Sequence, residues 1–101
     1  MAKEKYQVVW TKRSQEQMKQ VHDYISMDSP KNAEKVVNDI ATSVYAASVN
    51  PQIYPPDKYK INNDGSYRAF EKHHYRITYR FLANVLRVLR IRHTSREPLM
   101  Y

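Results

Sequence analysis

The sequence predicts an α+β domain with the element order β-α-α-β-β-β. Two observations support this. Two consecutive segments in the first half place apolar residues at helical spacing, and the last third alternates apolar and basic residues as half-buried strands do. Two helices with a short connection pack as a hairpin, which we expect to cover one face of a small, mainly antiparallel four-stranded sheet. With 101 residues the chain has room for one core, so we expect a single domain over 1–101.

The first strand and the first helix are predicted from the residues before position 28. Tyr, Val and Trp residues over 6–10 favour a short strand. Ser14, followed three positions later by Gln17, resembles a capping box, in which each side chain satisfies a free backbone N–H of the first turn. Met18 and Val21 continue at helical spacing. The first helix is therefore expected over 14–27.

The second helix has clear signals at both ends. Ser29 is a residue type that accepts a hydrogen bond at an N-cap, and Pro30 suits the first helical position because its φ is already helical. The Asn50-Pro51 pair ends the helix, since a residue before proline avoids helical backbone. We assign the apolar stripe between these ends to the core rather than to a cofactor. It consists of Ala33, Val36, Val37, Ile40, Val44 and Ala47.

A long loop is expected over 51–66, which holds three prolines and an Asn-Asp-Gly turn signal. Loops of this length in a compact domain are usually functional or disordered. Tyr54, Tyr59 and Ile61 indicate that this loop is held on the surface of the domain rather than free.

The last third is predicted to be a meander of three strands over 67–72, 75–81 and 85–92, with tight turns at 73–74 and 82–84. Apolar and basic residues alternate in the middle strand, which gives it one core face and one basic face. Alternation in the last strand places four residues on a shared face, apolar first and basic later. They are Leu86, Val88, Arg90 and Arg92.

The charge of the chain is concentrated in the same third. The whole sequence has 17 Lys and Arg against 10 Asp and Glu, a net charge of +7. Residues 67–96 contain eight of these bases, seven of them Arg, and one acid, Glu71, whereas the remaining residues hold nine bases and nine acids. Arg makes planar, bidentate contacts with phosphate and carboxylate. The segment therefore indicates an anionic partner, either nucleic acid or an acidic protein surface, with a merely solvated basic face as the alternative.

The composition excludes several classes of protein. The absence of Cys excludes a disulfide framework, a cysteine nucleophile and a thiolate metal site. The His residues do not have the spacing of metal ligands, so we expect no metal and no other cofactor. Apolar runs are too short for a membrane span, and the charged N-terminus lacks the apolar region of a signal peptide. We expect a cytoplasmic protein with no membrane partner.

One His has surroundings suited to chemistry. His93 follows the last predicted strand among basic residues, and nearby positive charge favours its neutral imidazole, which can serve as a general base. Metal-free RNA cleavage needs such a base, an acid for the leaving oxygen, and cations for the charge of the transition state. Arg76 and Arg68, with Lys58 and Lys60 from the loop, could supply the rest. The alternative is that His93 is a hydrogen-bonding surface group.

Several patterns together resemble a known family. Arg68 and Arg76 are eight residues apart, the second lies in a Tyr-Arg-Ile-x-Tyr sequence, and a His-x-x-Arg-x-Pro sequence begins at His93. An early Val-Val-Trp-Thr strand, two helices and a Tyr-Pro-Pro loop accompany them. In this combination the chain resembles the RelE/ParE superfamily, the toxins of bacterial type II toxin–antitoxin modules, often labelled plasmid stabilisation proteins. The resemblance covers most of the chain.

The resemblance implies a growth inhibitor, and the superfamily divides by mechanism. RelE-like toxins cleave mRNA in the ribosomal A site, using an Arg of the central strand and a His or Tyr near the chain end. Arg76 and His93 match these positions, with Arg68 as a further phosphate contact. The expected function is such a metal-independent, ribosome-dependent endoribonuclease, an mRNA interferase. The alternative is ParE-like inhibition of DNA gyrase without cutting nucleic acid, and a third reading is a basic nucleic-acid-binding module.

The resemblance also implies partners. A toxin has a cognate antitoxin, which should be an acidic or amphipathic segment that folds over the Arg-rich face. The target would be the ribosome with its mRNA, or DNA gyrase. In the first case RNA would be held by residues of the loop and of the last strands. They are Lys58, Lys60, Arg80, Arg90, Arg92 and Arg96.

Overall fold

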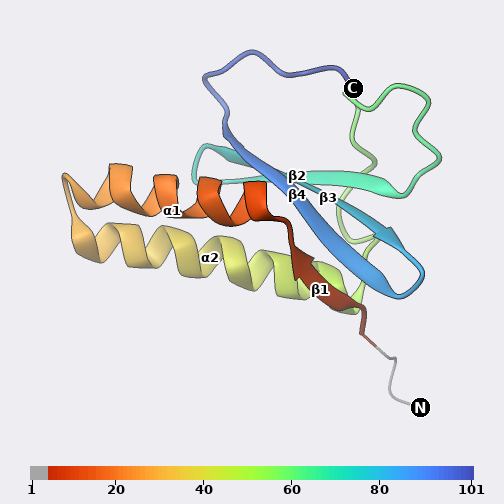
Figure 1. Cartoon of the computed structure of the whole chain (residues 1–101), viewed down its shortest axis with the longest axis horizontal. Coiled ribbons are helices and arrows are strands. Elements are labelled where there is room, and N and C mark those ends of the chain that lie inside the picture. The colour runs from red at the N-terminus through yellow and green to blue at the C-terminus, as the bar shows by residue number, and fades with distance from the viewer. Residues whose placement is uncertain (1–4) are drawn as a thin grey trace.

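The predicted element order and the α+β class are confirmed by the computed structural model, which describes residues 5–101 (Figure 1). The elements are β1 Gln7–Trp10, α1 Lys12–Ser26, α2 Pro30–Val49, β2 Tyr67–Lys72, β3 Tyr75–Leu82 and β4 Val85–His93. The strands form one sheet in the order β1-β4-β3-β2, in which β1 runs parallel to β4 and the other neighbours are antiparallel.

The two faces of the sheet are covered differently. The α1–α2 hairpin packs on one face, while the loop between α2 and β2 and the segment 94–101 meet on the other side, where the end of the chain lies beside the loop (Figure 1). Within residues 5–101, neither helix has the length and apolar character needed to cross a bilayer.

The start of α1 differs from the prediction. Thr11 is the N-cap, because its Oγ1 accepts a hydrogen bond from the Ser14 N–H at 3.1 Å, and the helix begins at Lys12. The capping box expected from Ser14 and Gln17 is wrong. The Gln17 Oε1 instead accepts the backbone N–H of Ile91 at 2.7 Å, which ties α1 to β4. The second helix begins as predicted, with the Ser29 side chain accepting from the backbone of its first turn.

Both predicted turns of the meander are present as two-residue connections, and the second is one residue shorter than predicted because Leu82 belongs to β3. His73 and His74 have φ angles of 50° and 68°, and Ala83 and Asn84 have 51° and 63°. Two positive φ values in succession are the signature of a type I′ turn, whose twist matches that of the flanking strands. The last two strands each extend one residue beyond the predicted bounds.

An irregularity in β4 changes which side chains face the core. Thr78 of β3 pairs with Arg90, but the next residue, Tyr79, pairs with Val88, so Leu89 is an extra residue. Such a bulge reverses the phase of the side chains that follow. The predicted shared face is therefore wrong: Leu86 and Val88 are buried in the core, and the basic residues of β4 share the opposite face.

The core lies between the helix hairpin and the sheet. Val36, Ile40 and Val44 of α2 meet the wholly buried Tyr79 and Ile77 of β3. Tyr79 also carries a polar atom into this core, and its hydroxyl donates to the Pro51 carbonyl at 2.6 Å. This bond fixes the start of the long loop on the helix side. Burial raises the pKa of the Tyr79 hydroxyl, so the group stays protonated and able to donate at neutral pH.

We predict that Tyr79→Phe lowers the free energy of unfolding by about 1–2 kcal/mol, because the Pro51 carbonyl loses its partner in a buried place. Tyr75→Phe is the matched control: its hydroxyl has no hydrogen bond to any of residues 5–101, so the loss should be smaller. Urea unfolding of the two variants beside the parent protein measures both values. Equal losses would contradict the assigned role of the Tyr79 hydroxyl.

Candidate binding site on the basic sheet face

Five arginines share the face of the sheet that the helices leave uncovered. They come from two neighbouring strands, and the register places Arg76 opposite Arg92 and Arg80 opposite Arg87, with Arg90 between these pairs. Like charges directly opposite one another destabilise a sheet. Nearby anions offset this repulsion, and the loop over 51–66 supplies two of them, Asp57 and Asp64. We call these five residues and the side chains around them the basic face.

Asp57 is the anion at the centre of the basic face. Its side chain has no exposed surface, and its Oδ1 accepts from Arg76 Nη2 at 2.7 Å and from the Tyr59 N–H at 3.1 Å. Its Oδ2 accepts from the Tyr101 hydroxyl at 2.6 Å. Burial alone would raise the pKa of Asp57, but these hydrogen bonds and the Arg76 charge hold it below its ordinary value. The carboxylate is thus charged, buried and fully paired.

The end of the chain closes over this pair. The Tyr101 N–H donates to the Tyr59 carbonyl at 3.0 Å, and the Ile61 N–H donates to the Tyr101 carbonyl. Burial and the bond to Asp57 raise the pKa of the Tyr101 hydroxyl, which keeps it a donor. Only about 20 Å³ of cavity remains between Arg76, the loop and the segment 94–101. The Arg76 side chain is thus largely covered, with 19% of its surface still exposed.

Arg76 is also held by a second acid and an aromatic ring. Its Nη1 lies 3.3 Å from Glu71, and its guanidinium lies 4.8 Å from the ring centroid of Tyr59. Glu71 is the single acid of the basic segment, and Arg76 is its Cα partner in the register. The charge of Arg76 is thus balanced within the chain.

The outer part of the basic face is open. A groove of about 690 Å³ runs from the start of α1 across the β3–β4 hairpin to the end of the chain. Tyrosine rings hold two of its cations: Arg80 lies 4.7 Å from the ring of Tyr67, and Arg90 lies 3.9 Å from that of Tyr101. The basic groove, as we call it, is lined by Arg13, Arg80, Arg87, Arg90, Tyr67, Tyr101, Thr11, Leu82, Ala83, Val85 and Leu89.

Charge in the basic groove is only partly balanced. Arg80 lies 3.8 Å from Asp64, at the edge of ion-pair distance. Among residues 5–101, no carboxylate comes within 4.0 Å of Arg13, Arg87 or Arg90. The lining also contains aliphatic side chains, of which Leu82 is 56% exposed. Such a groove can take an acidic segment that also carries apolar side chains.

The two loop lysines named from the sequence lie beside this face. Lys60 Nζ is 4.8 Å from the ring of Tyr67 and 5.4 Å from that of Tyr101, and Lys58 Nζ is 5.3 Å from the ring of Tyr59. Arg96 lines a separate pocket near α1, and Arg92 lines both that pocket and the small cavity beside Arg76. The six residues expected to hold RNA are thus divided between two places.

Arg68, expected on a phosphate, holds the loop instead. Its Nε donates to the Gly65 carbonyl at 2.8 Å and its Nη1 to the Tyr54 carbonyl at 3.0 Å. Its Cα partner is the buried Tyr79, so its side chain leaves the sheet on the helix side. The shape of the loop depends on these two bonds.

His93 also lies away from the basic face. Its Cα partner is the buried Tyr75, and the two rings meet edge to face with centroids 5.1 Å apart. The Ser95 N–H donates to His93 Nδ1 at 3.0 Å, and the Ser95 hydroxyl lies 2.7 Å from the same atom. A backbone N–H can only donate, so Nδ1 carries a lone pair and the proton of the neutral imidazole is on Nε2.

The three residues expected to cleave RNA are not brought together. Arg76 points to the basic face, whereas Arg68 and His93 leave the sheet on the helix side. The strands that carry these last two flank β3 on opposite sides, and their partners on β3 are four residues apart. At about 3.3 Å per residue, Arg68 and His93 are separated by about 13 Å along the strands and about 10 Å across them.

Two residues that organise the site were not found from the sequence. Asp57 was assigned no role, and Tyr101 was only one of many tyrosines. The signal available was an acid within a tyrosine-rich loop, opposite a segment with one acid and eight bases. A carboxylate in that position can form an ion pair with one of the bases and so stabilise the fold. Which base it pairs with depends on how the loop returns over the sheet.

Comparison with known families identifies the class of protein, a toxin of a type II toxin–antitoxin system. Residues 8–98 match the profile of the family described as "ParE toxin of type II toxin-antitoxin system, parDE". The chain belongs to this ParE family, and the resemblance to the RelE/ParE superfamily is confirmed.

Two solved structures share the fold. The chromosomal ParDE toxin–antitoxin system from P. aeruginosa matches with a TM-score of 0.70 and 21% identity, over 87% of this chain and 95% of that one. The toxin–antitoxin complex RelBE2 from Mycobacterium tuberculosis matches with a TM-score of 0.61 and 14% identity, over 88% and 91%. The comparison with curated proteins gave no match.

We predict that Asp57→Asn lowers the free energy of unfolding at pH 7 by about 3 kcal/mol, because it leaves Arg76 without its buried partner. The native pKa of Asp57 is below that of the unfolded chain, so its contribution is complete above about pH 4 and is lost as the pH falls through the native value. The deficit of the variant should therefore shrink in acid.

Urea unfolding at pH 7 and at several acidic values measures this difference. Asp28→Asn is the control, since Asp28 is exposed and its carboxylate makes no hydrogen bond or ion pair within residues 5–101. A deficit of Asp57→Asn that stays constant down to the lowest pH would contradict the assignment of the stabilisation to the charged carboxylate.

Proposed function

We propose that this ParE-family toxin stops growth by binding DNA gyrase through the basic groove, and that it does not cleave mRNA on the ribosome. The observation that carries the proposal is the separation of Arg76, Arg68 and His93 onto two faces of the sheet. Cleavage of a phosphodiester needs the base, the acid and the cations within reach of one phosphate.

The state of each group also argues against catalysis. Neutral His93 has its proton on Nε2 and its lone pair on Nδ1, where Ser95 already donates, so no free lone pair is left to accept a proton. Arg76 is neutralised by Asp57 and Glu71 under the end of the chain. It could contact a phosphate only after that cover opened.

The basic groove favours a protein target. Its arginines alternate with aliphatic and tyrosine side chains, a composition typical of protein interfaces, in which Arg and aromatic residues are enriched. Unbalanced charge on Arg13 and Arg87 would attract an acidic surface and speed its association. Gyrase is the target that membership of the ParE family supports.

Two assays with purified toxin distinguish the mechanisms. We predict intact mRNA on programmed ribosomes, mapped by primer extension, and loss of supercoiling when the toxin is added to DNA gyrase. The double variant Arg80→Gln/Arg87→Gln should inhibit gyrase at least about tenfold less, because it removes two groove cations. New 5′ ends at A-site codons, or gyrase that remains fully active, would refute the proposal.

We expect the antitoxin to bind in the same groove. We propose a cognate antitoxin whose acidic, amphipathic segment folds along the groove and so blocks the target. The double variant Arg13→Gln/Arg87→Gln should bind the co-encoded antitoxin about tenfold more weakly at low salt, and the difference should shrink as salt rises.

Calorimetric titration with the antitoxin measures these affinities. Lys31→Gln/Lys72→Gln is the control, because it removes the same charge from exposed positions outside the groove. If both double variants bind alike, the antitoxin does not occupy the groove and neutralisation by occlusion is wrong.

A further inference from the structure

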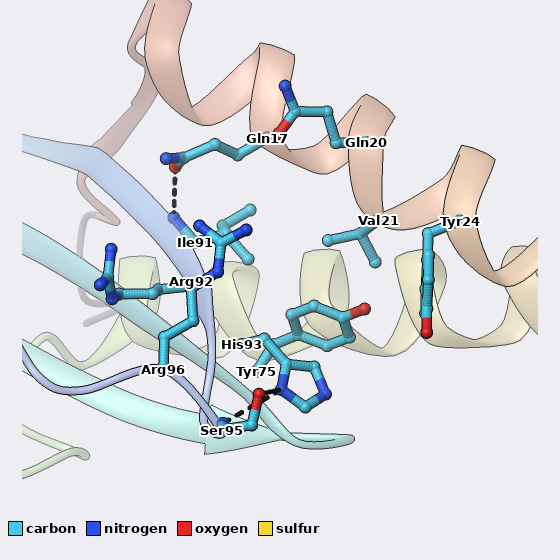
Figure 2. A pocket seen from close by; sticks show the side chains of 10 residues that line it. All are labelled: Gln17, Gln20, Val21, Tyr24, Tyr75, Ile91, Arg92, His93, Ser95 and Arg96. Atoms are coloured by element: carbon cyan, nitrogen blue, oxygen red, sulfur yellow. Dashed lines mark hydrogen bonds between the residues drawn. The ribbon is translucent and has the colours of Figure 1, made fainter.

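A second cavity, on the helix side of the sheet, is independent of the basic groove. It has a volume of about 390 Å³ and lies between α1 and the end of β4 (Figure 2). Figure 2 shows Gln20, Val21 and Tyr24 on its α1 side and His93, Tyr75 and Ser95 on its strand side. This volume lies in the range of sites for small organic ligands.

Most of the polar groups that line this cavity can donate hydrogen bonds. The proton of His93 is on Nε2, because Nδ1 accepts from Ser95. The Oε1 of Gln17 is used by the Ile91 N–H, which leaves the Gln17 amide N–H groups (Figure 2). Tyr75 and Tyr24 add hydroxyls that make no hydrogen bond to other residues of 5–101. The imidazole N–H and the Gln17 amide N–H groups only donate, and the hydroxyls can donate too, so the lining favours a ligand with several acceptor oxygens.

The charge of the cavity is positive. Arg96 lines it, together with part of Arg92, whose side chain belongs to the basic face, and no Asp or Glu does. The Arg92 Nε donates to the Glu97 carbonyl at 3.2 Å, which steadies the side chain without neutralising it. Among residues 5–101, no carboxylate lies within ion-pair distance of either guanidinium. The ligand should therefore be an anion.

The apolar half of the wall indicates what else the ligand carries. Val21 and Ile91 line it together with the rings of Tyr24 and Tyr75, and Tyr24 is 69% exposed at the rim. A bare anion would leave this wall unused. A planar, weakly polar group attached to the anion could stack on the exposed ring.

We propose that this cavity binds the terminal phosphate of a nucleotide, with its base against Tyr24. A phosphate monoester offers three acceptor oxygens and close to two charges, which suits the Arg96 guanidinium, an imidazole N–H and neighbouring hydroxyls better than a carboxylate does. The phosphate belongs either to a free mononucleotide or to the 5′ end of a nucleic acid. The site is on the helix side, so it does not depend on the function proposed for the groove.

NMR titration of the full chain with adenosine monophosphate tests this site. We expect saturable shifts of His93, Ser95 and Tyr24, at least about tenfold weaker binding of adenosine, and measurable binding of inorganic phosphate alone. Arg96→Gln and His93→Phe should each weaken binding about tenfold, since each removes a donor to a charged oxygen. Lys31→Gln, which removes the same charge on exposed α2, should change it less than twofold.

A trinucleotide with a 5′-phosphate and its 5′-hydroxyl counterpart distinguish the two sources of phosphate. Tighter binding of the phosphorylated trinucleotide than of the mononucleotide identifies a nucleic-acid end, and the reverse order identifies a free nucleotide. Three results would overturn the proposal. They are no saturable shift at millimolar nucleotide, equal weakening by Lys31→Gln and Arg96→Gln, or a glutamate-rich peptide that displaces the nucleotide more effectively than phosphate does. Unchanged amide spectra of the free variants confirm that they are folded.

Discussion

The ion pair between Asp57 and Arg76 is the interaction on which the rest of the basic face depends. Five arginines on two adjacent strands repel one another, and a carboxylate buried among them offsets that repulsion where it is greatest. Desolvating Asp57 is costly, and the cost is met by hydrogen bonds to both oxygens. The same carboxylate fixes the loop through Tyr59 and the end of the chain through Tyr101. One side chain thus joins three segments that are distant in sequence.

This arrangement separates the charged surface into a sealed part and an open part. Around Arg76 the charge is neutralised and covered, whereas along the outer groove Arg13 and Arg87 keep theirs. A face built in this way suits recognition, because its cations are held in place by rings and carbonyls before a partner arrives, which lowers the entropy lost on binding. The function proposed above rests on this contrast, since the cation with the buried partner is also the one that the loop and the segment 94–101 cover.

The helices and strands could be predicted from the sequence, whereas the contacts between them could not. Ser29 and Pro30 determine the start of α2 through local chemistry alone, and the alternation of β3 identifies its core face. The bulge at Leu89 could not be predicted, because it depends on the register with β3 and with Thr11 of the neighbouring segment. The pairing of Asp57 with Tyr101 lay out of reach for the same reason, as no spacing rule relates residues that the fold alone brings together.

A hydrogen bond decides whether the His93 imidazole offers a lone pair or an N–H, which the sequence alone does not reveal. A strand-end imidazole among arginines could supply a lone pair or an N–H, and these options point to opposite functions. Ser95, two residues further on, settles the choice by donating its backbone N–H to Nδ1. The imidazole then presents Nε2–H to the cavity beside Tyr75. The same short turn thus supports both of our proposals, because it occupies the lone pair that a base would need and leaves an N–H that an anion could accept.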